Sequence, residues 1–372
     1  MTSLILMILA PIVSTVAPAA SPAEARIQQA RASIESGAAD AKSLNRLAVA
    51  LTRRARETGD PSYYDRAIAA LAEAGRIEPG NPETTRVSAW TRMGRHEFSE
   101  AFEITRRYAA SHPDDDVNLG VMGDALMELG RYDEAAVAYQ RMLDLRPGPA
   151  SYSRAAYLRE VTGDLEGSLD LMRMALQATD RRETEDRAWL LVQIGHLHEV
   201  MGEESRAETT YRAALDSFPG YHYALTALAD LALRRGLAAG AETLARDAIK
   251  AAPHAERYLL LADALRCQGR GKEADAAEKL FETLASANIA KNDNENHDLV
   301  LYYLERRPDL KRALEIARME ARRRRDVHTL DRLALALHRS GRTRRARRLA
   351  ERILAVGTRD PLIASHAREI IN

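Results

Sequence analysis

The chain has 372 residues, of which 46% are hydrophobic and only 5% aromatic, and its 54 Lys and Arg balance its 54 Asp and Glu. With no net charge, no global field would draw the protein toward nucleic acid or an anionic membrane. A single cysteine, Cys267, excludes an internal disulfide framework and a zinc site built from cysteines. The abundance of Ala, Leu, Arg and Glu favours helix, and no Pro-rich or Ser/Gly-rich linker divides the chain.

The N-terminus carries an uncharged apolar run from Leu4 to Ala17, followed by small residues suited to cleavage. This pattern predicts a signal peptide over residues 1–20, although no Lys or Arg precedes the run. The run is short for a bilayer span. We therefore expect a bacterial protein that is exported, periplasmic or secreted. The alternative is an uncleaved N-terminal segment that anchors the protein in the inner membrane.

The middle of the chain repeats itself. The stretch "GRYDEAAVAYQRMLDLRPG" (Gly130 to Gly148) is followed 72 residues later by "GEESRAETTYRAALDSFPG" (Gly202 to Gly220), and the register returns from Gly236. Upstream of each glycine, apolar residues recur at i, i+3, i+4 and i+7, which is one face of a helix. Each unit therefore reads as helix, glycine turn, helix and terminating proline, with a period near 34, and such a period indicates a solenoid.

These units resemble the tetratricopeptide repeat (TPR) family, which uses small, aromatic and proline residues at fixed positions. The best matches are Gly123, Ala135, Tyr139 and Pro147, then Gly195, Ala207, Tyr211, Ala214 and Pro219, then Ala229, Ala241, Ala248 and Pro253. The resemblance implies an all-α fold, a right-handed superhelical solenoid of about eight helix-turn-helix repeats. Such pairs cannot bury their apolar faces alone, so each must stack on the next.

The expected solenoid covers residues 24–372. Its best-matching units are 116–149, 188–221 and 222–254, its degenerate units lie near 41–80 and 292–326, and a terminal capping helix covers 360–372.

Motifs that would carry chemistry are missing from the sequence. There is no Gly-rich phosphate loop, no GxSxG nucleophile elbow and no HExxH. His196 and His198 point to different faces of their expected helix, so they cannot chelate one ion. The segment Asn292 to Asp298 lacks the central Gly and distal Glu of a calcium loop. We therefore expect no enzyme, no metal and no cofactor.

The resemblance implies that the first helices of the units line a concave groove. The residues expected there are Asp124, Tyr157, His196, Asp230, Asp263, Trp189, Glu160 and Tyr223, with Trp90 as a further candidate. This set is acidic and aromatic and lacks the Lys, Asn and Arg with which some family members clamp a C-terminal carboxylate. It predicts a non-catalytic scaffold that binds a protein segment with basic and apolar side chains. The alternative is that these residues cap helices or pair with nearby arginines.

A basic region lies near the C-terminus. Between Lys311 and Arg352 there are 15 Lys or Arg and 5 Asp or Glu, and the run Arg322 to Arg325 (Arg322, Arg323, Arg324, Arg325) is uninterrupted. Further along, Ala346, Leu349, Ala350 and Ile353 form an apolar stripe, which predicts that the arginines cover the solvated face of a packed helix pair. No aromatic residue is interleaved with them for base stacking, so nucleic acid is not favoured. The alternative function is an envelope assembly or regulatory factor whose basic C-terminal repeats contact a membrane or polyanion. Neither the partner nor the oligomeric state can be read from the sequence.

Overall fold

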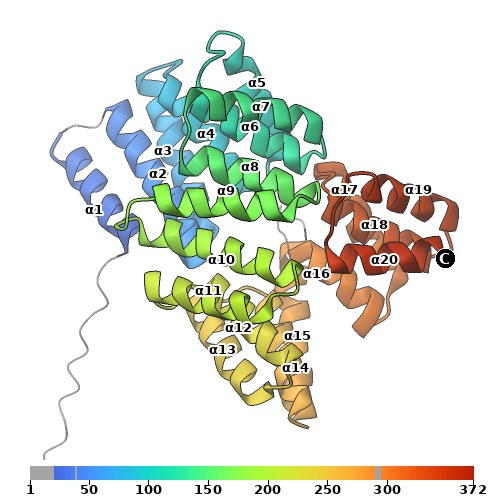
Figure 1. The fold of residues 1–372 in the computed structure, drawn as a ribbon. Helices are drawn as coiled ribbons and strands as arrows, with labels where there is room; N and C mark the ends of the chain where they lie inside the picture. Colours follow the sequence, from blue (N-terminus) through green and yellow to red (C-terminus); the bar gives the residue numbers. More distant parts are fainter. Residues whose placement is uncertain (1–20, 38–39, 290–294) are drawn as a thin grey trace, which may run out of the picture.

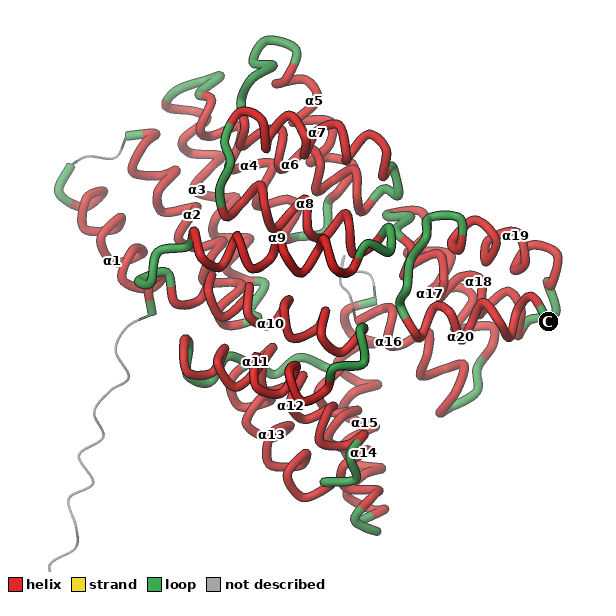
Figure 2. Tube along the Cα trace, viewed as in Figure 1, coloured by secondary structure: helices red, strands yellow, loops and turns green. Residues whose placement is uncertain are grey.

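The computed structural model describes residues 21–37, 40–289 and 295–372. The predicted signal peptide and residues 292–294 of the last degenerate unit lie outside this part of the chain. Within the described ranges every regular element is a helix, and no strand is present (Figure 2). None of these helices has both the length and the apolar character needed to cross a bilayer. The all-α prediction is therefore confirmed.

Consecutive helices pack together in pairs, and the described residues contain nine such pairs, where the sequence predicted about eight. The first helices of the pairs are α2 (Ala41–Thr58), α4 (Pro82–Gly94), α6 (Asp116–Glu128), α8 (Pro149–Val161), α10 (Thr184–Val200), α12 (His222–Arg234), α14 (Glu256–Cys267), α16 (Glu295–Leu301) with its π-helical continuation η1 (Tyr302–Arg306), and α18 (Val327–Arg339). The second helices are α3 (Ser62–Ile77), α5 (Phe98–Ala109), α7 (Tyr132–Leu145), α9 (Leu165–Ala178), α11 (Glu204–Ser217), α13 (Ala238–Ala251), α15 (Gly271–Asn288), α17 (Leu310–Arg323) and α19 (Thr343–Leu354). α1 (Pro22–Glu35) precedes the pairs and α20 (Pro361–Ile371) follows them.

The repeated glycines separate the two helices of a pair. Gly202 follows α10 with φ at +78°, and Gly130 follows α6 with φ at +68°. Only glycine adopts this left-handed conformation without steric cost, which explains why the glycine is the most regular feature of the repeat.

Packing inside a pair depends on small residues that face aromatic ones. Ala207 is fully buried, and Tyr139 and Tyr211 are 2% and 1% exposed. A Cβ atom added to Gly195 would lie 2.3 Å from the Tyr211 ring, and one added to Gly123 would lie 2.3 Å from the Tyr139 ring. The glycine of the first helix and the tyrosine of the second are therefore complementary, as the repeat register predicts.

The length of the first helix varies among both the regular and the degenerate units. α2 has 18 residues and α10, in a best-matching unit, has 17, whereas α6 and α12 have 13 each. The described part of α16 begins at Glu295 and passes into the π-helical η1 after Leu301.

Helix pairs that are far apart in the sequence also contact each other. The Arg325 backbone N–H donates to the Glu128 carbonyl oxygen (2.8 Å), and the Val327 N–H donates to the Tyr132 hydroxyl (2.8 Å). A Cβ on Gly130 would lie 2.3 Å from the Arg325 carbonyl oxygen. The α17–α18 connection is thus docked on the α6–α7 turn, and Figure 1 shows α17 to α20 beside one end of α7 to α9. We call this contact the C-terminal seam.

A second contact joins the N-terminal helices to the middle of the chain. Arg56 at the end of α2 forms ion pairs with Glu185 and Asp186 of α10. The Tyr221 hydroxyl donates to Glu185 (2.9 Å), and His222 Nε2 lies 3.2 Å from the Arg56 carbonyl oxygen. The partners of Arg56 lie 129 to 166 residues further along the chain, so the solenoid coils back on itself instead of remaining an open arc.

The largest core cluster spans the C-terminal seam. It combines residues of α6 to α8 with residues of α14 to α20, and α20 contributes Ile363, Ala367 and Ile370. The C-terminal helices are therefore held by apolar burial as well as by polar contacts.

Candidate binding groove

The eight predicted groove residues lie on five successive first helices. α6 carries Asp124, α8 carries Tyr157 and Glu160, α10 carries Trp189 and His196, α12 carries Tyr223 and Asp230, and α14 carries Asp263. The structure shows what each of them contacts.

The carboxylate of Asp124 is already engaged. Arg154 of α8 donates to it through Nη2 (2.8 Å) and Nε (2.9 Å), and the Tyr139 hydroxyl donates to it at 2.9 Å. One helix further along, His196 Nε2 lies 3.2 Å from Glu160. Both pairs bridge neighbouring first helices.

The same arrangement continues through α12 and α14. Arg234 of α12 pairs with Glu199 of α10 and with Asp230 one turn earlier in its own helix. Arg306 of η1 holds Asp263 of α14 with two bonds of 2.5 and 2.6 Å.

The predicted groove residues therefore form an ion-pair ladder and not an unpaired acidic surface. Its members are Asp124 with Arg154, Glu160 with His196, Glu199 and Asp230 with Arg234, and Asp263 with Arg306. The pairing of these residues with nearby arginines is the alternative that the sequence left open. Such partly exposed pairs stabilise a fold only slightly, but they neutralise the charge that would attract a purely basic segment.

The α6–α8 part of the ladder is covered by the chain itself. Tyr157 packs against the core cluster that contains α16 to α18, and burial together with the Glu128, Asp326 and Glu160 carboxylates raises the pKa of its hydroxyl. Burial and the neighbouring Asp326 carboxylate likewise raise the pKa of Glu128 to about 7, although Arg324 opposes the shift.

The α10–α14 part remains accessible. The side chains of His196, Asp230 and Asp263 are 45%, 52% and 36% exposed. Burial opposes protonation of His196, but the hydrogen bond to Glu160 and the charges of Glu160, Glu199 and Asp360 together outweigh it and raise the pKa of His196. We call these three residues, with Arg234, the open groove, after the concave surface on which the sequence predicts them.

The three aromatic candidates differ in how exposed they are and in what they contact. Trp189 is half-buried and packs against two core clusters, one formed by α8 to α10 and one formed by α10 to α12. Tyr223 is 41% exposed, and its ring lies 4.1 Å from that of His222 near the N-terminal end of α12. Trp90 on α4 is half-buried. Of the three, Tyr223 is the most exposed, although its ring also contacts those of Tyr221 and His222.

The arginine run near the C-terminus is not one patch. Arg324 is 5% exposed and lies 3.6 to 3.8 Å from carboxylate oxygens of Glu128, Glu320 and Asp326. Arg323 pairs with Glu320 at 3.0 Å. Arg322 and Arg325 are exposed. The predicted solvated face therefore holds for the ends of the run, whereas Arg324 is buried because the C-terminal seam closes over it.

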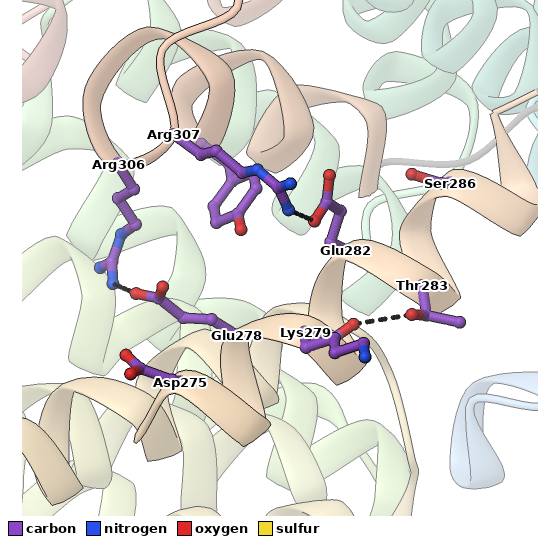
Figure 3. Close-up of a pocket in the computed structure, with 9 residues that line it drawn as sticks. Asp275, Glu278, Lys279, Glu282, Thr283, Ser286, Arg306 and Arg307 are labelled. Atoms are coloured by element: carbon purple, nitrogen blue, oxygen red, sulfur yellow. Dashed lines mark hydrogen bonds and ion pairs between the residues drawn. The ribbon is translucent and has the colours of Figure 1, made fainter. Parts of the chain in front are cut away.

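A cleft that the sequence did not predict lies between α15 and η1. Figure 3 shows charged side chains from both elements pointing toward one another across it. It has a volume of about 580 Å³ and is lined by Asp275, Glu278, Lys279, Glu282, Thr283, Ser286, Tyr302, Arg306 and Arg307. Arg306 pairs with Glu278 (3.3 Å) and Arg307 with Glu282, so most of its charge is neutralised internally. Over the described residues, no group of three or more His, Cys, Asp or Glu is placed to hold a metal ion.

Comparisons with known proteins agree with this architecture. Residues 121–183 and 192–256 match a family model described as Tetratricopeptide repeat. Over 207 residues the chain is 28% identical to "Cellulose synthase operon protein C" of Pseudomonas fluorescens (strain SBW25), an alignment that covers 55% of this chain but only 14% of that protein.

Two solved structures resemble most of the array. A structure of the human IFIT1 dimer with PPP-AAAA is 17% identical, with a TM-score of 0.55 over 85% of this chain and 72% of that one. A chain of the APC/C hetero-tetramer Cut9-Hcn1 is 15% identical, with a TM-score of 0.54 over 78% of this chain and 55% of that one. At these identities the likeness shows the fold alone, a TPR-like α-solenoid.

Proposed function

We propose that this chain, a solenoid with tetratricopeptide repeats at residues 121–183 and 192–256, is a non-catalytic scaffold for protein–protein interaction. The observation that carries the proposal is the open groove. Three successive first helices present accessible, hydrogen-bonding side chains in one row, and stacked helix pairs hold that row rigidly.

The partner segment would lie across α10, α12 and α14. Because Asp230 and Asp263 already have arginine partners, a purely basic segment would have to displace Arg234 or Arg306. A segment with both acidic and basic side chains can add to these pairs without breaking them. Tyr223 supplies an exposed ring for an apolar side chain at one end.

The place of action follows from the N-terminal apolar run. We propose that the protein is exported to the periplasm or secreted, with an uncleaved inner-membrane anchor as the alternative. The bacterial relative supports a bacterial setting for this scaffold.

Site-specific photocrosslinking tests the groove. A benzophenone amino acid would replace Asp230 or Asp263 in the full chain, expressed in its own host, and the crosslinked partner peptide would be identified by mass spectrometry. Asp247 is the control position, because it is exposed on the second helix α13. We expect one partner peptide to crosslink from both groove positions and not from Asp247.

A second experiment tests whether a charge change at one groove position prevents binding at another. Asp230→Lys should remove the crosslink from position 263, because it breaks the Asp230–Arg234 pair and repels the basic side chains of the segment. Equal crosslinking from position 247, or no effect of Asp230→Lys, would refute the groove as the binding surface.

A further inference from the structure

The outer helix α19 presents a row of arginines to solvent. Arg344, Arg345, Arg348 and Arg352 are all exposed. Their spacings of three and four residues place them along one side of the helix. Between the first and the last, the helix rises by about 12 Å. We call these four residues the arginine stripe.

The stripe has no counter-charges of its own. Within the described chain no ion pair or hydrogen bond of these four side chains is found, and the one carboxylate on their helix, Glu351, pairs with Arg347 at 3.1 Å. Two other second helices, α11 and α13, pair their arginines with acidic residues. On α11, Arg212 pairs with Glu208 at 2.7 Å, and on α13, Arg246 pairs with Glu242 at 2.8 Å.

The stripe also works against the helix that carries it. Like charges three and four residues apart repel, and cations in the first turn, such as Arg344 and Arg345, oppose the helix dipole. The helix is held by its buried face of Ala346, Ala350 and Ile353. Packing therefore explains the apolar side of α19. On the charged side, Arg352 acts on the Tyr132 hydroxyl of α7, where its positive charge opposes the rise in the pKa of that group. In the described part of the chain, Arg344, Arg345 and Arg348 have no such neighbour.

We propose that the arginine stripe is a second interaction surface, separate from the open groove, that binds an acidic segment of a protein partner. The planar guanidinium fork matches carboxylates with two parallel hydrogen bonds, and the stripe contains arginine only. An acidic helix with carboxylates at i, i+4 and i+8 has the same rise and would place them opposite the stripe.

Other polyanions fit this face less well. α19 contains no aromatic residue on which a nucleobase could stack. A membrane-binding helix combines basic side chains with exposed apolar ones, whereas the large exposed apolar side chain of α19 is Leu354 alone, at its C-terminal end.

The test uses the full chain and a defined probe. A fluorescein-labelled alanine-based 16-residue peptide with Glu at three positions spaced four apart would be titrated by anisotropy at 50 mM salt. We expect binding that weakens at least tenfold in Arg345→Glu/Arg348→Glu and weakens again at 300 mM salt. Circular dichroism would check that the variant is folded, and Arg348→Gln, which adds no new charge, should show a smaller loss in the same direction.

The matched control is Lys250→Glu/Lys272→Glu. It makes the same change in net charge at exposed positions on α13 and α15, and it should bind within twofold of the parent chain. Vesicles with 30% phosphatidylglycerol and a 16-nucleotide single-stranded DNA serve as competing probes. Unchanged peptide binding in the stripe variant, an equal loss in the lysine control, or tighter binding of either competing probe would overturn the proposal. Asp230→Lys should leave peptide binding unchanged, so a failed groove and a failed stripe are told apart.

Discussion

Gly195 and Tyr211 form the contact on which a repeat unit most depends, and a double-mutant cycle measures it. In an open helix position, Gly→Ala stabilises by about 1 kcal/mol, because alanine loses less backbone freedom on folding. At Gly195 the new methyl would lie 2.3 Å from Cε1 of Tyr211. The ring cannot move aside, since it is 1% exposed and its hydroxyl is hydrogen-bonded to Glu199.

Overpacking of this kind costs about 1 to 3 kcal/mol. Gly195→Ala should therefore be neutral or destabilising by up to about 2 kcal/mol, once the helix propensity gain of about 1 kcal/mol is subtracted. Tyr211→Ala should cost about 3 to 5 kcal/mol, by analogy with other buried aromatic truncations. In the Tyr211→Ala background the clash is gone, so Gly195→Ala should stabilise by about 1 kcal/mol. The coupling energy is then about 1 to 3 kcal/mol.

Urea unfolding followed by far-UV circular dichroism measures the four corners of this cycle. Because long repeat arrays can unfold in parts, amide exchange of α10 and α11 should be followed in parallel. Gly75→Ala is the control, since a Cβ at Gly75 of α3 meets nothing within 4 Å. Additive effects, or a Gly195→Ala variant as stable as Gly75→Ala, would refute the glycine–tyrosine contact.

Three further predictions concern the seam and the ladder. Gly130→Ala should increase amide exchange at Arg325 and expand the particle in small-angle scattering, whereas Gly202→Ala, with similar φ but open space around it, should only lower stability by about 1 to 2 kcal/mol. Because the pKa of Glu128 is raised to about 7, the folded state keeps a proton that the unfolded state has already released, so stability should fall from about pH 5 to pH 7. Melting curves of Glu128→Gln should lack this fall, and an identical pH profile would contradict the assignment. The pKa of His196 is raised, so its contribution should be present below pH 6 and disappear as pH rises through the folded pKa. His196→Gln should remove this dependence from the melting curves.

The sequence predicts the local part of the fold well because the repeat encodes it directly. Ala135, Ala207 and Ala241 are fully buried, as small contact residues should be. The facing tyrosines are buried against glycines in the register that the sequence indicates. Each of these contacts joins residues of one unit, and the periodicity reports such neighbours.

The coiling of the array on itself could not be predicted in this way. Gly130 is a turn residue with positive φ, and it also allows the Arg325 carbonyl oxygen to approach closely. Only the turn recurs with the repeat period, so only that role is visible in the sequence. Arg324 is likewise indistinguishable from its neighbours in sequence, although it alone of the four is buried.

The candidate groove shows the same limit. Position in the unit places Asp124, Asp230 and Asp263 on the first helices, but their basic partners follow at different intervals. Arg154 comes 30 residues after Asp124, whereas Arg306 comes 43 residues after Asp263. An irregular spacing gives no periodic signal. The sequence therefore suggested a row of unpaired carboxylates, whereas the structure pairs these carboxylates with arginines.

A solenoid that touches itself has a fixed number of units. Open arrays can gain or lose a pair by duplication or deletion, because each pair contacts only its neighbours. Here an extra pair between α8 and α16 would carry Arg325 away from Glu128 and break the backbone hydrogen bond that joins the two turns. Relatives that share this closure should therefore vary in sequence and in loop length, but not in how many hairpins separate the two docked turns.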